Sequence, residues 1–228
     1  MSNSDFQLPE SFDGHVRLFP LPNMVLFPGI MQALNLFEPR YRQLMEHVLE
    51  DDHLITMAMV KPDPVNLTMP VPEICQTVCV GKIMTHAKLD NGTYNLFLAG
   101  VSRAVIVTEL ASDTLYRQAK VKLMSETRLS PSEENALRTN LIQLFKQTRG
   151  SQSNLNNEAE IEKFNVGQLV DVIAYSSGIS PMEQQRILEA ADVRTRSHLL
   201  IAALKRRGED ISSDAGGARQ FPPGFSLN

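Results

Sequence analysis

Residues 15–37, HVRLFPLPNMVLFPGIMQALNLF, decide the fold of the first half of the chain. Three short apolar runs are separated here by Pro20, Pro22, Pro28 and Gly29. Each run is too short for a helix and the prolines interrupt helical continuation, so the pattern predicts strands joined by tight turns. The chain therefore opens with β-structure.

The next stretch, EPRYRQLMEHVLEDD (residues 38–52), has the period of a helix. Its apolar residues recur at i, i+3, i+4, i+7 and i+8 and share one stripe: Tyr41, Leu44, Met45, Val48 and Leu49. Pro39 suits the first helical position, and the carboxylate of Glu38 suits the positive end of the helix dipole. One amphipathic helix therefore interrupts the predicted sheet.

Strand patterns return after this helix. Residues 53–60 predict one strand, and residues 101–110 and 116–124 predict two more. Together with a hairpin between them, at least six strands are expected before residue 126.

The hairpin is the clearest local signal. Segments 78–89 and 93–99 flank Asp90-Asn91-Gly92, whose Asn-Gly pair predicts a two-residue type I′ turn. In its second segment Tyr94, Leu96 and Leu98 alternate with Asn95, Phe97 and Ala99. This alternation predicts a buried face, with little exposed surface on the other face.

The hydrophobic period changes from two to 3.6 after residue 126. Ser130-Pro131-Ser132-Glu133 and Ser180-Pro181-Met182-Glu183 are both capping boxes with proline at the first helical position. Asp192 is placed to cap a last helix. Residues 127–208 are therefore predicted to form a bundle of about four helices.

Three polar segments carry little to bury. Residues 1–14 and 209–228 are expected to be flexible tails, and residues 150–157, GSQSNLNN, a flexible elbow between helices.

The composition is typical of a soluble globular protein: 228 residues, 43% hydrophobic, with a formal net charge of −4. The negative charge disfavours nucleic acid as a partner. No apolar run is long enough to span a membrane and no export signal is recognisable, so the cytoplasm is the expected location.

Neither cysteines nor histidines indicate a metal site or a cofactor. Cys75 and Cys79 lie in one predicted extended segment, roughly 13 Å apart, which is too far for a disulfide. Their spacing is not that of a zinc knuckle, and the five histidines are scattered. We expect both thiols to pack as small hydrophobic groups, and we expect no cofactor.

Several ordered elements resemble the amino-terminal, substrate-binding domain family of the Lon ATP-dependent proteases. The opening LFPLPNMVLFPGIMQALNLFEPRYRQLMEHVLEDDHLITMAMV (residues 18–60) resembles the family's first segment, and residues 79–110 are similar to its middle segment. Residues 179–204, ISPMEQQRILEAADVRTRSHLLIAAL, are similar to its closing helices. The resemblance covers about residues 15–207.

The resemblance implies an α+β fold: a PUA-like β pseudo-barrel with one inserted helix over residues 15–126, followed by the C-terminal helical bundle over residues 127–208. Full Lon proteases continue into an AAA+ ATPase, which needs a G-x-x-x-x-G-K-[ST] phosphate loop. No such string occurs in this sequence. The sequence is thus expected to be a standalone Lon-type domain without catalytic residues.

The implied function is recognition of unfolded or extended hydrophobic polypeptide segments, as an adaptor or holdase. Apolar residues near the prolines and in the following strand are the candidate peptide-binding residues: Met24, Leu26, Phe27, Met57 and Met59. The alternative, that these side chains fill the barrel core, stays open. A second candidate surface is the junction between strands and helices, where concave sites tend to form.

The family's most recognisable string, Glu38 to Tyr41, is interpreted as architecture. The residues of the structural family motif are Pro28, Gly29, Phe37, Glu38, Pro39, Arg40 and Tyr41. Expected partners are polypeptide segments and a separate protease or chaperone, with neither nucleic acid nor a membrane. Two other hypotheses stay open: RNA binding, as in several PUA-like relatives, and a scaffold that self-associates weakly.

Overall fold

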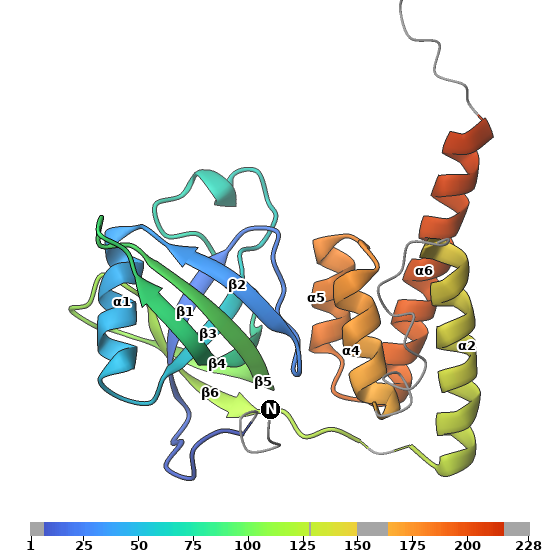
Figure 1. Ribbon diagram of the computed structural model, residues 1–228, viewed down its shortest axis with the longest axis horizontal. Coiled ribbons are helices and arrows are strands. Elements are labelled where there is room, and N and C mark those ends of the chain that lie inside the picture. The colour runs from blue at the N-terminus through green and yellow to red at the C-terminus, as the bar shows by residue number, and fades with distance from the viewer. Residues whose placement is uncertain (1–6, 128, 150–163, 217–228) are drawn as a thin grey trace, which may run out of the picture.

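The computed structural model describes residues 7–127, 129–149 and 164–216. A strand-rich unit and a helical unit lie side by side (Figure 1). Residues 150–157, where an elbow was expected, lie outside the described residues. The arrangement confirms the predicted α+β organisation, a PUA-like pseudo-barrel with one inserted helix followed by a helical bundle.

The strand-rich unit is one six-stranded sheet in the order β2-β5-β4-β3-β1-β6. Its strands are β1 (His15–Leu21), β2 (Met31–Leu36), β3 (Leu54–Met59), β4 (Thr77–Lys88), β5 (Tyr94–Leu110) and β6 (Gln118–Leu123). The sheet closes because β6 pairs with both β1 and β5. This leaves β2 paired along one edge only, with the first half of β5.

Two strand predictions were wrong. The middle run of the opening stretch, residues 23–27, forms no strand, and its Val25, Leu26 and Phe27 fill the core instead. The segments predicted as separate strands on either side of Gly100 form the single long strand β5. A missing side chain at Gly100 lets the strand continue where the chain at Phe27 crosses it closely.

The predicted type I′ turn was also wrong. Leu89 and Thr93 are bonded across a three-residue loop, with Leu89 N donating to Thr93 O at 2.9 Å. Only Gly92 has a positive φ, at 76°, and Asn91 does not. The Asn91 side chain instead accepts from Thr93 N at 3.1 Å, and this geometry suits the longer hairpin loop that ends in a left-handed glycine.

Helix α1 (Pro39–Leu49) begins at Pro39, as predicted, and buries Tyr41, Leu44, Met45 and Val48. The sheet has apolar residues packed on both of its faces, and every residue of β3 is buried. One face of β3 packs in the larger cluster through Ile55, Met57 and Met59, and the other packs in a second cluster through Leu54 and Ala58.

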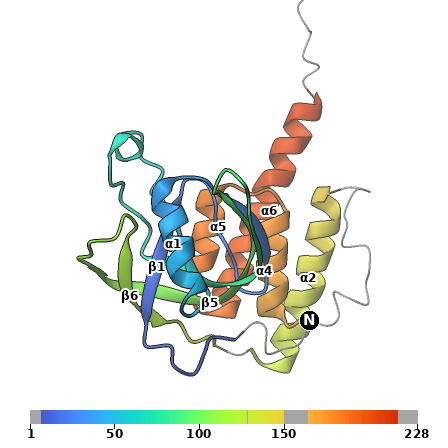
Figure 2. The same cartoon turned by 60° about the vertical axis from the view of Figure 1, so that its left-hand side comes forward.

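The described part of the second half contains four helices: α2 (Pro131–Arg149), α4 (Val166–Ser176), α5 (Pro181–Glu189) and α6 (Val193–Gly216). The capping box predicted from Ser180 to Glu183 is confirmed, with both reciprocal bonds present. Asp192 accepts from Thr195 N at 2.8 Å at the start of α6, as predicted. Helices α4 and α5 lie nearest the sheet (Figure 1), and Figure 2 shows α2 beside α4 and clear of the strands.

Both expected tails are partly structured. Leu8 and Phe12 pack against the second apolar cluster, and α6 continues to Gly216, where a tail from residue 209 was expected. Residues 1–6 and 217–228 lie outside the described part of the chain.

Candidate functional site

Four of the five candidate peptide-binding residues lie in the core. Leu26, Phe27, Met57 and Met59 are between 0% and 3% exposed, so they present no surface to a ligand in this structure. Met24 is half-buried and packs against the same cluster. Met57 and Met59 are buried because apolar packing covers both faces of β3, and Leu26 and Phe27 belong to the same core cluster.

The segment from Glu38 to Tyr41 positions the start of α1. The Arg40 guanidinium pairs with the Glu38 carboxylate at 2.8 Å and lies over the Tyr41 ring, 4.6 Å from its centroid. Tyr41 is buried and donates its hydroxyl to Pro20 O at 3.2 Å, while burial raises its pKa to about 12. These contacts join α1 to the end of β1.

The Pro28-Gly29 turn fastens the loop before β2 to β5. Gly29 has a φ of 78° and donates its backbone N–H to Gly100 O at 2.9 Å. Phe37, which lies between the end of β2 and the N-cap Glu38 of α1, is 63% exposed. It is therefore available for contact, unlike the buried Tyr41.

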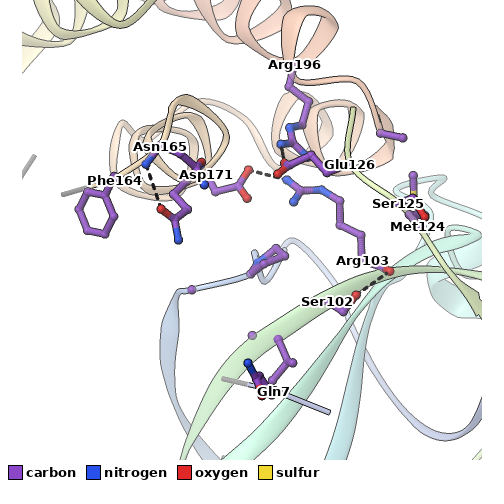
Figure 3. Close-up of a pocket in the computed structure, with 16 residues that line it drawn as sticks. Gln7, Ser102, Arg103, Met124, Ser125, Glu126, Phe164, Asn165, Asp171 and Arg196 are labelled. Atoms are coloured by element: carbon purple, nitrogen blue, oxygen red, sulfur yellow. Dashed lines mark hydrogen bonds and ion pairs between the residues drawn. The ribbon is translucent and has the colours of Figure 1, made fainter. Parts of the chain in front are cut away.

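A cleft of about 530 Å³ lies at the junction of the sheet and the helices, where the sequence indicated a second candidate surface (Figure 3). Its floor is the part of β5 from Gly100 to Arg103, and its opposite wall is the start of α4, from the N-cap Asn165 to Asp171. Charged side chains from both units point into it (Figure 3).

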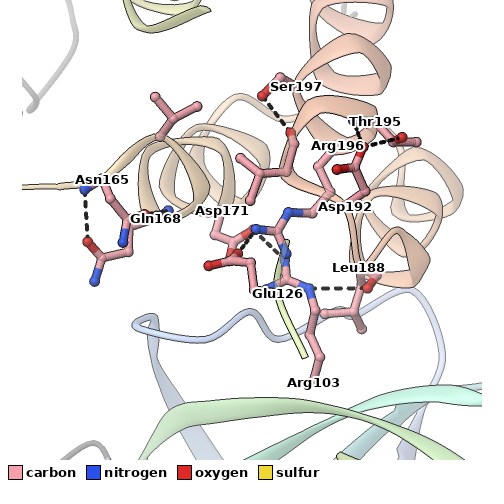
Figure 4. Close-up of polar contacts among 12 residues, drawn as sticks. Arg103, Glu126, Asn165, Gln168, Asp171, Leu188, Asp192, Thr195, Arg196 and Ser197 are labelled. Atoms are coloured by element: carbon pink, nitrogen blue, oxygen red, sulfur yellow. Dashed lines mark hydrogen bonds and ion pairs between the residues drawn. The ribbon is translucent and has the colours of Figure 1, made fainter. Parts of the chain in front are cut away.

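The central contact in this cleft is a buried ion pair between Arg103 on β5 and Asp171 on α4 (Figure 4). Arg103 Nε also donates to Leu188 O at 3.2 Å. Burial raises the pKa of Asp171, and the nearby charge of Arg103 opposes that rise only in part. Desolvation therefore outweighs attraction at this carboxylate.

A second pair, Arg196 with Glu126, lies beside the first (Figure 4). Arg196 is only 1% exposed, and burial together with the charge of Arg103 lowers its pKa to about 9. The hydrogen bond to the Glu126 carboxylate offsets part of the desolvation cost of the buried Arg196 guanidinium. A Cβ on Gly167 would lie 2.7 Å from Glu126 Oε1 and 2.8 Å from Arg196 Nη2, so a larger residue there would displace one of these side chains.

The ionic groups named in this cleft thus bind each other across the two units. Such a network suits a role in fixing the helices on the sheet, and its charges are a poor match for an apolar segment. An apolar segment therefore requires a different surface.

A groove of about 490 Å³ crosses the outer face of β2, β5 and β4. None of its lining residues is Asp, Glu, Lys or Arg: Ala33, Leu34, Asn35, Thr85, His86, Ala87, Asn95, Leu96 and Phe97. Phe97 is 46% exposed and lies opposite Ala33 in the β2–β5 register. The groove therefore combines a large apolar side chain with an uncharged lining.

Phe97 was missed because little exposed surface was expected on this face, and that expectation was wrong. The predicted alternation is confirmed, since Tyr94, Leu96 and Leu98 are buried. The same alternation places Phe97 on the outward face of the strand. An aromatic residue in that position was the signal that could have identified the groove.

A second exposed apolar segment lies in the loop between β3 and β4, which contains the short 3₁₀-helix η2 (Asn66–Thr68) and projects from the sheet (Figure 1). Its exposed side chains are Val65, Leu67, Met69 and Val71. The buried Asn66 holds the loop closed, donating from Nδ2 to Lys61 O and Glu73 O at 3.0 Å each.

Within the described residues, no group of three or more His, Cys, Asp or Glu side chains is arranged to hold a metal ion. No helix in that part of the chain combines the length and hydrophobicity that crossing a bilayer requires.

Relatives identified by sequence are Lon proteases. The chain is 29% identical over 203 residues to Lon protease of Bacillus thuringiensis (strain Al Hakam), covering 86% of this chain and 25% of that protein. It is 29% identical over 190 residues to Lon protease 2 of Syntrophobacter fumaroxidans, covering 82% of this chain and 23% of that protein. The chain thus spans about a quarter of the length of these relatives.

Solved structures support the fold. The N-terminal domain of Mycobacterium avium complex Lon protease superposes with a TM-score of 0.68 at 15% identity, over 84% of this chain and 98% of that one. The Lon N-terminal domain protein from Xanthomonas campestris gives a TM-score of 0.61 at 19% identity, over 82% and 97% of the two chains.

The family model of the ATP-dependent protease La (LON) substrate-binding domain matches residues 15–206, which include the whole sheet, α1 and most of the helical unit. The chain therefore belongs to the LON substrate-binding domain family.

Proposed function

We propose that this domain recognises extended apolar segments of polypeptides, and that it binds them in the outer groove of β2, β5 and β4. The observation that carries the proposal is the exposed Phe97 ring beside an uncharged lining. Membership of a family described as substrate-binding supports a polypeptide ligand.

The groove suits apolar side chains in several ways. Removing the exposed part of a phenylalanine from water is worth on the order of 1 kcal/mol, and an unpaired charge in the lining would reduce that gain. Phe37 lies one residue beyond β2 and is 63% exposed, which adds a second aromatic contact at the end of that strand. Unfolded chains expose such side chains, whereas native proteins bury most of theirs.

In this proposal the domain acts without catalysis, as an adaptor or holdase in the cytoplasm. It would keep an unfolded segment from aggregating or present it to a separate protease or chaperone. Aggregation prevented in the absence of any nucleotide is the expected sign of such a role.

RNA binding is less well supported. Arg186, Arg206 and Arg207 lie around one cavity at the α5–α6 end, but Arg206 pairs with Glu183 at 2.8 Å and Arg207 donates to Gly178 O. With a formal net charge of −4, the chain has little bulk attraction for phosphates.

The proposal is tested by titrating the domain into two fluorescently labelled samples of one protein. One sample is reduced and carboxymethylated, so that it cannot fold, and the other is unmodified and native. We expect binding to the unfolded form only. Phe97→Asp should weaken it about tenfold, as expected when a contact worth about 1.4 kcal/mol is lost.

Val107→Asp is the matched control, because Val107 is on the same strand and 68% exposed but lies outside the groove. It should leave the affinity within about twofold. Equal weakening by both variants, or equal binding to native and unfolded protein, would contradict the proposal.

A further inference from the structure

The strand β2 ends the sheet on one side. It pairs with β5 from Met31 to Leu36, and among the described residues no other strand and no other backbone group bonds to it. Its second edge therefore carries backbone donors and acceptors without a strand partner.

The direction of each backbone group follows from the ladder. Ile30 O accepts from Gly100 N at 2.8 Å, so the carbonyl of residue 30 faces β5. In an antiparallel pair this orientation repeats every second residue. The backbone groups of Gln32 and Leu34 thus face β5, and those of Ala33 and Asn35 point away from it, toward the free edge.

One group on this edge already bonds to a side-chain amide. Gln32 Nε2 donates to Ala33 O at 2.8 Å, and Gln32 Oε1 accepts from the Tyr175 hydroxyl on α4 at 2.6 Å. The amide N–H of a glutamine has the same donor chemistry as a peptide N–H. The Ala33 carbonyl is therefore placed to accept a backbone donor from an added chain.

The residues of β2 include none of those that usually protect a sheet edge against pairing. Sheet edges are commonly protected by lysine, proline or inward charges, and β2, MQALNL, contains none of these residues. Ala33 and Asn35 are exposed, and both line the groove that holds Phe97. The free edge and the groove are thus parts of one continuous surface.

We propose that an extended client segment binds by adding a strand to the free edge of β2, taking the place of the Gln32 amide at Ala33 O. This inference rests on the proposed function and specifies its ligand: a segment in β conformation, recognised through its main chain. Alternate side chains of the added strand lie on the same face as Ala33, Asn35 and Phe97, so apolar residues are favoured at every second position.

Amide hydrogen exchange followed by NMR tests the placement, with the domain alone and with a peptide of alternating valine and threonine ended by lysines. The peptide should slow exchange at Ala33 and Asn35. Gln32 and Leu34 are the matched controls, because their amides already belong to the ladder with β5 and should change little.

N-methylation of the same peptide tests the main-chain contacts without altering the protein. Methylating alternate amides in one register should weaken binding about tenfold or more, because each lost hydrogen bond costs on the order of 1 kcal/mol and the methyl group blocks the strand. Methylating the intervening amides should have much less effect.

The outcomes separate the two proposals. Binding that is sensitive to Phe97→Asp but shows no two-residue periodicity and no protection at Ala33 overturns strand addition and leaves the groove proposal standing. No binding of the peptide or of the unfolded protein overturns both. Protection at Ala33 that grows with protein concentration in the absence of peptide assigns the edge to a second copy, which also overturns the client assignment.

Discussion

Arg103 on β5 donates a hydrogen bond from Nη2 to Oδ1 of Asp171 on α4, and the two side chains are only 7% and 4% exposed. The residues are 68 positions apart in the sequence. Their contact joins the sheet to the helical unit, together with the bond from Gln185 Nε2 to Thr77 O at 3.0 Å.

Breaking this ion pair on one side should be costly. Asp171→Ala leaves the buried Arg103 guanidinium without its carboxylate, and we expect a loss of about 3 kcal/mol in the free energy of unfolding, measured in urea. The exposed Lys61–Glu73 pair supplies the control, and Glu73→Ala should change stability little.

Replacing both partners with leucine should restore much of that loss. The raised pKa of Asp171 indicates that burial outweighs the attraction of Arg103, and apolar side chains do not carry that desolvation cost. A double variant as unstable as the sum of the two single variants would show that the two residues act independently, and would contradict the expected rescue.

The capping residue Asp192 makes stability depend on pH. Hydrogen bonds from the hydroxyl and backbone N–H of Thr195 lower the pKa of Asp192, so the folded state favours its ionised form. That contribution is complete above the ordinary pKa near 3.8 and is lost as the pH falls through the lowered pKa of the folded state.

We therefore expect the stability advantage of the natural domain over Asp192→Asn to hold down to about pH 4 and to shrink as the pH falls further, in urea unfolding experiments. Asp192→Ala should cost about 1 kcal/mol at neutral pH, because no side-chain acceptor remains. An advantage that grows on acidification would contradict the assigned cap.

Local and nonlocal features differed in how well the sequence revealed them. The cap from Ser180 to Glu183 depends on four adjacent residues, and it was predicted correctly. Whether Met57 lies in a core or on a surface depends on what covers β3, and Met57 is buried because apolar packing covers both faces of that strand. The near-continuous apolar run LITMAMV, residues 54–60, is consistent with such burial, but it does not identify the segments that cover each face.

The candidate groove depends on contacts of both kinds. The outward position of Phe97 follows from its own alternation and was available from the sequence. The edge of β2 is free because β6, and not β2, pairs with the second half of β5. Strand β6 begins over 80 residues after β2, and strand patterns do not show which strands pair.

The two thiols should differ in reactivity. Cys79 is completely buried and burial raises its pKa to about 12, while the half-buried Cys75 has a pKa raised by burial to a lesser extent. Because the thiolate is the reactive form, we expect a disulfide reagent at pH 8 to modify Cys75 slowly and Cys79 only after unfolding. In Cys75→Ser the native protein should then give almost no signal, and rapid labelling of this variant would show that Cys79 is accessible.

Gly100 and Gly29 should respond differently to the same substitution, although they are hydrogen-bonded to each other. A Cβ on Gly100 would lie 2.1 Å from Phe27 O, a backbone atom that cannot move without displacing the core side chains on either side of it. Gly100→Ala should therefore lower the free energy of unfolding by about 3 kcal/mol, the upper part of the range for overpacking.

Gly29 has open space around its Cα, and alanine there meets only the strain of a φ of 78°, for a loss of about 1 kcal/mol. Thermal and urea unfolding of the two variants measure this difference, and Gly29→Ala proving the more damaging change would mean that the crossing at Phe27 is looser than its geometry indicates.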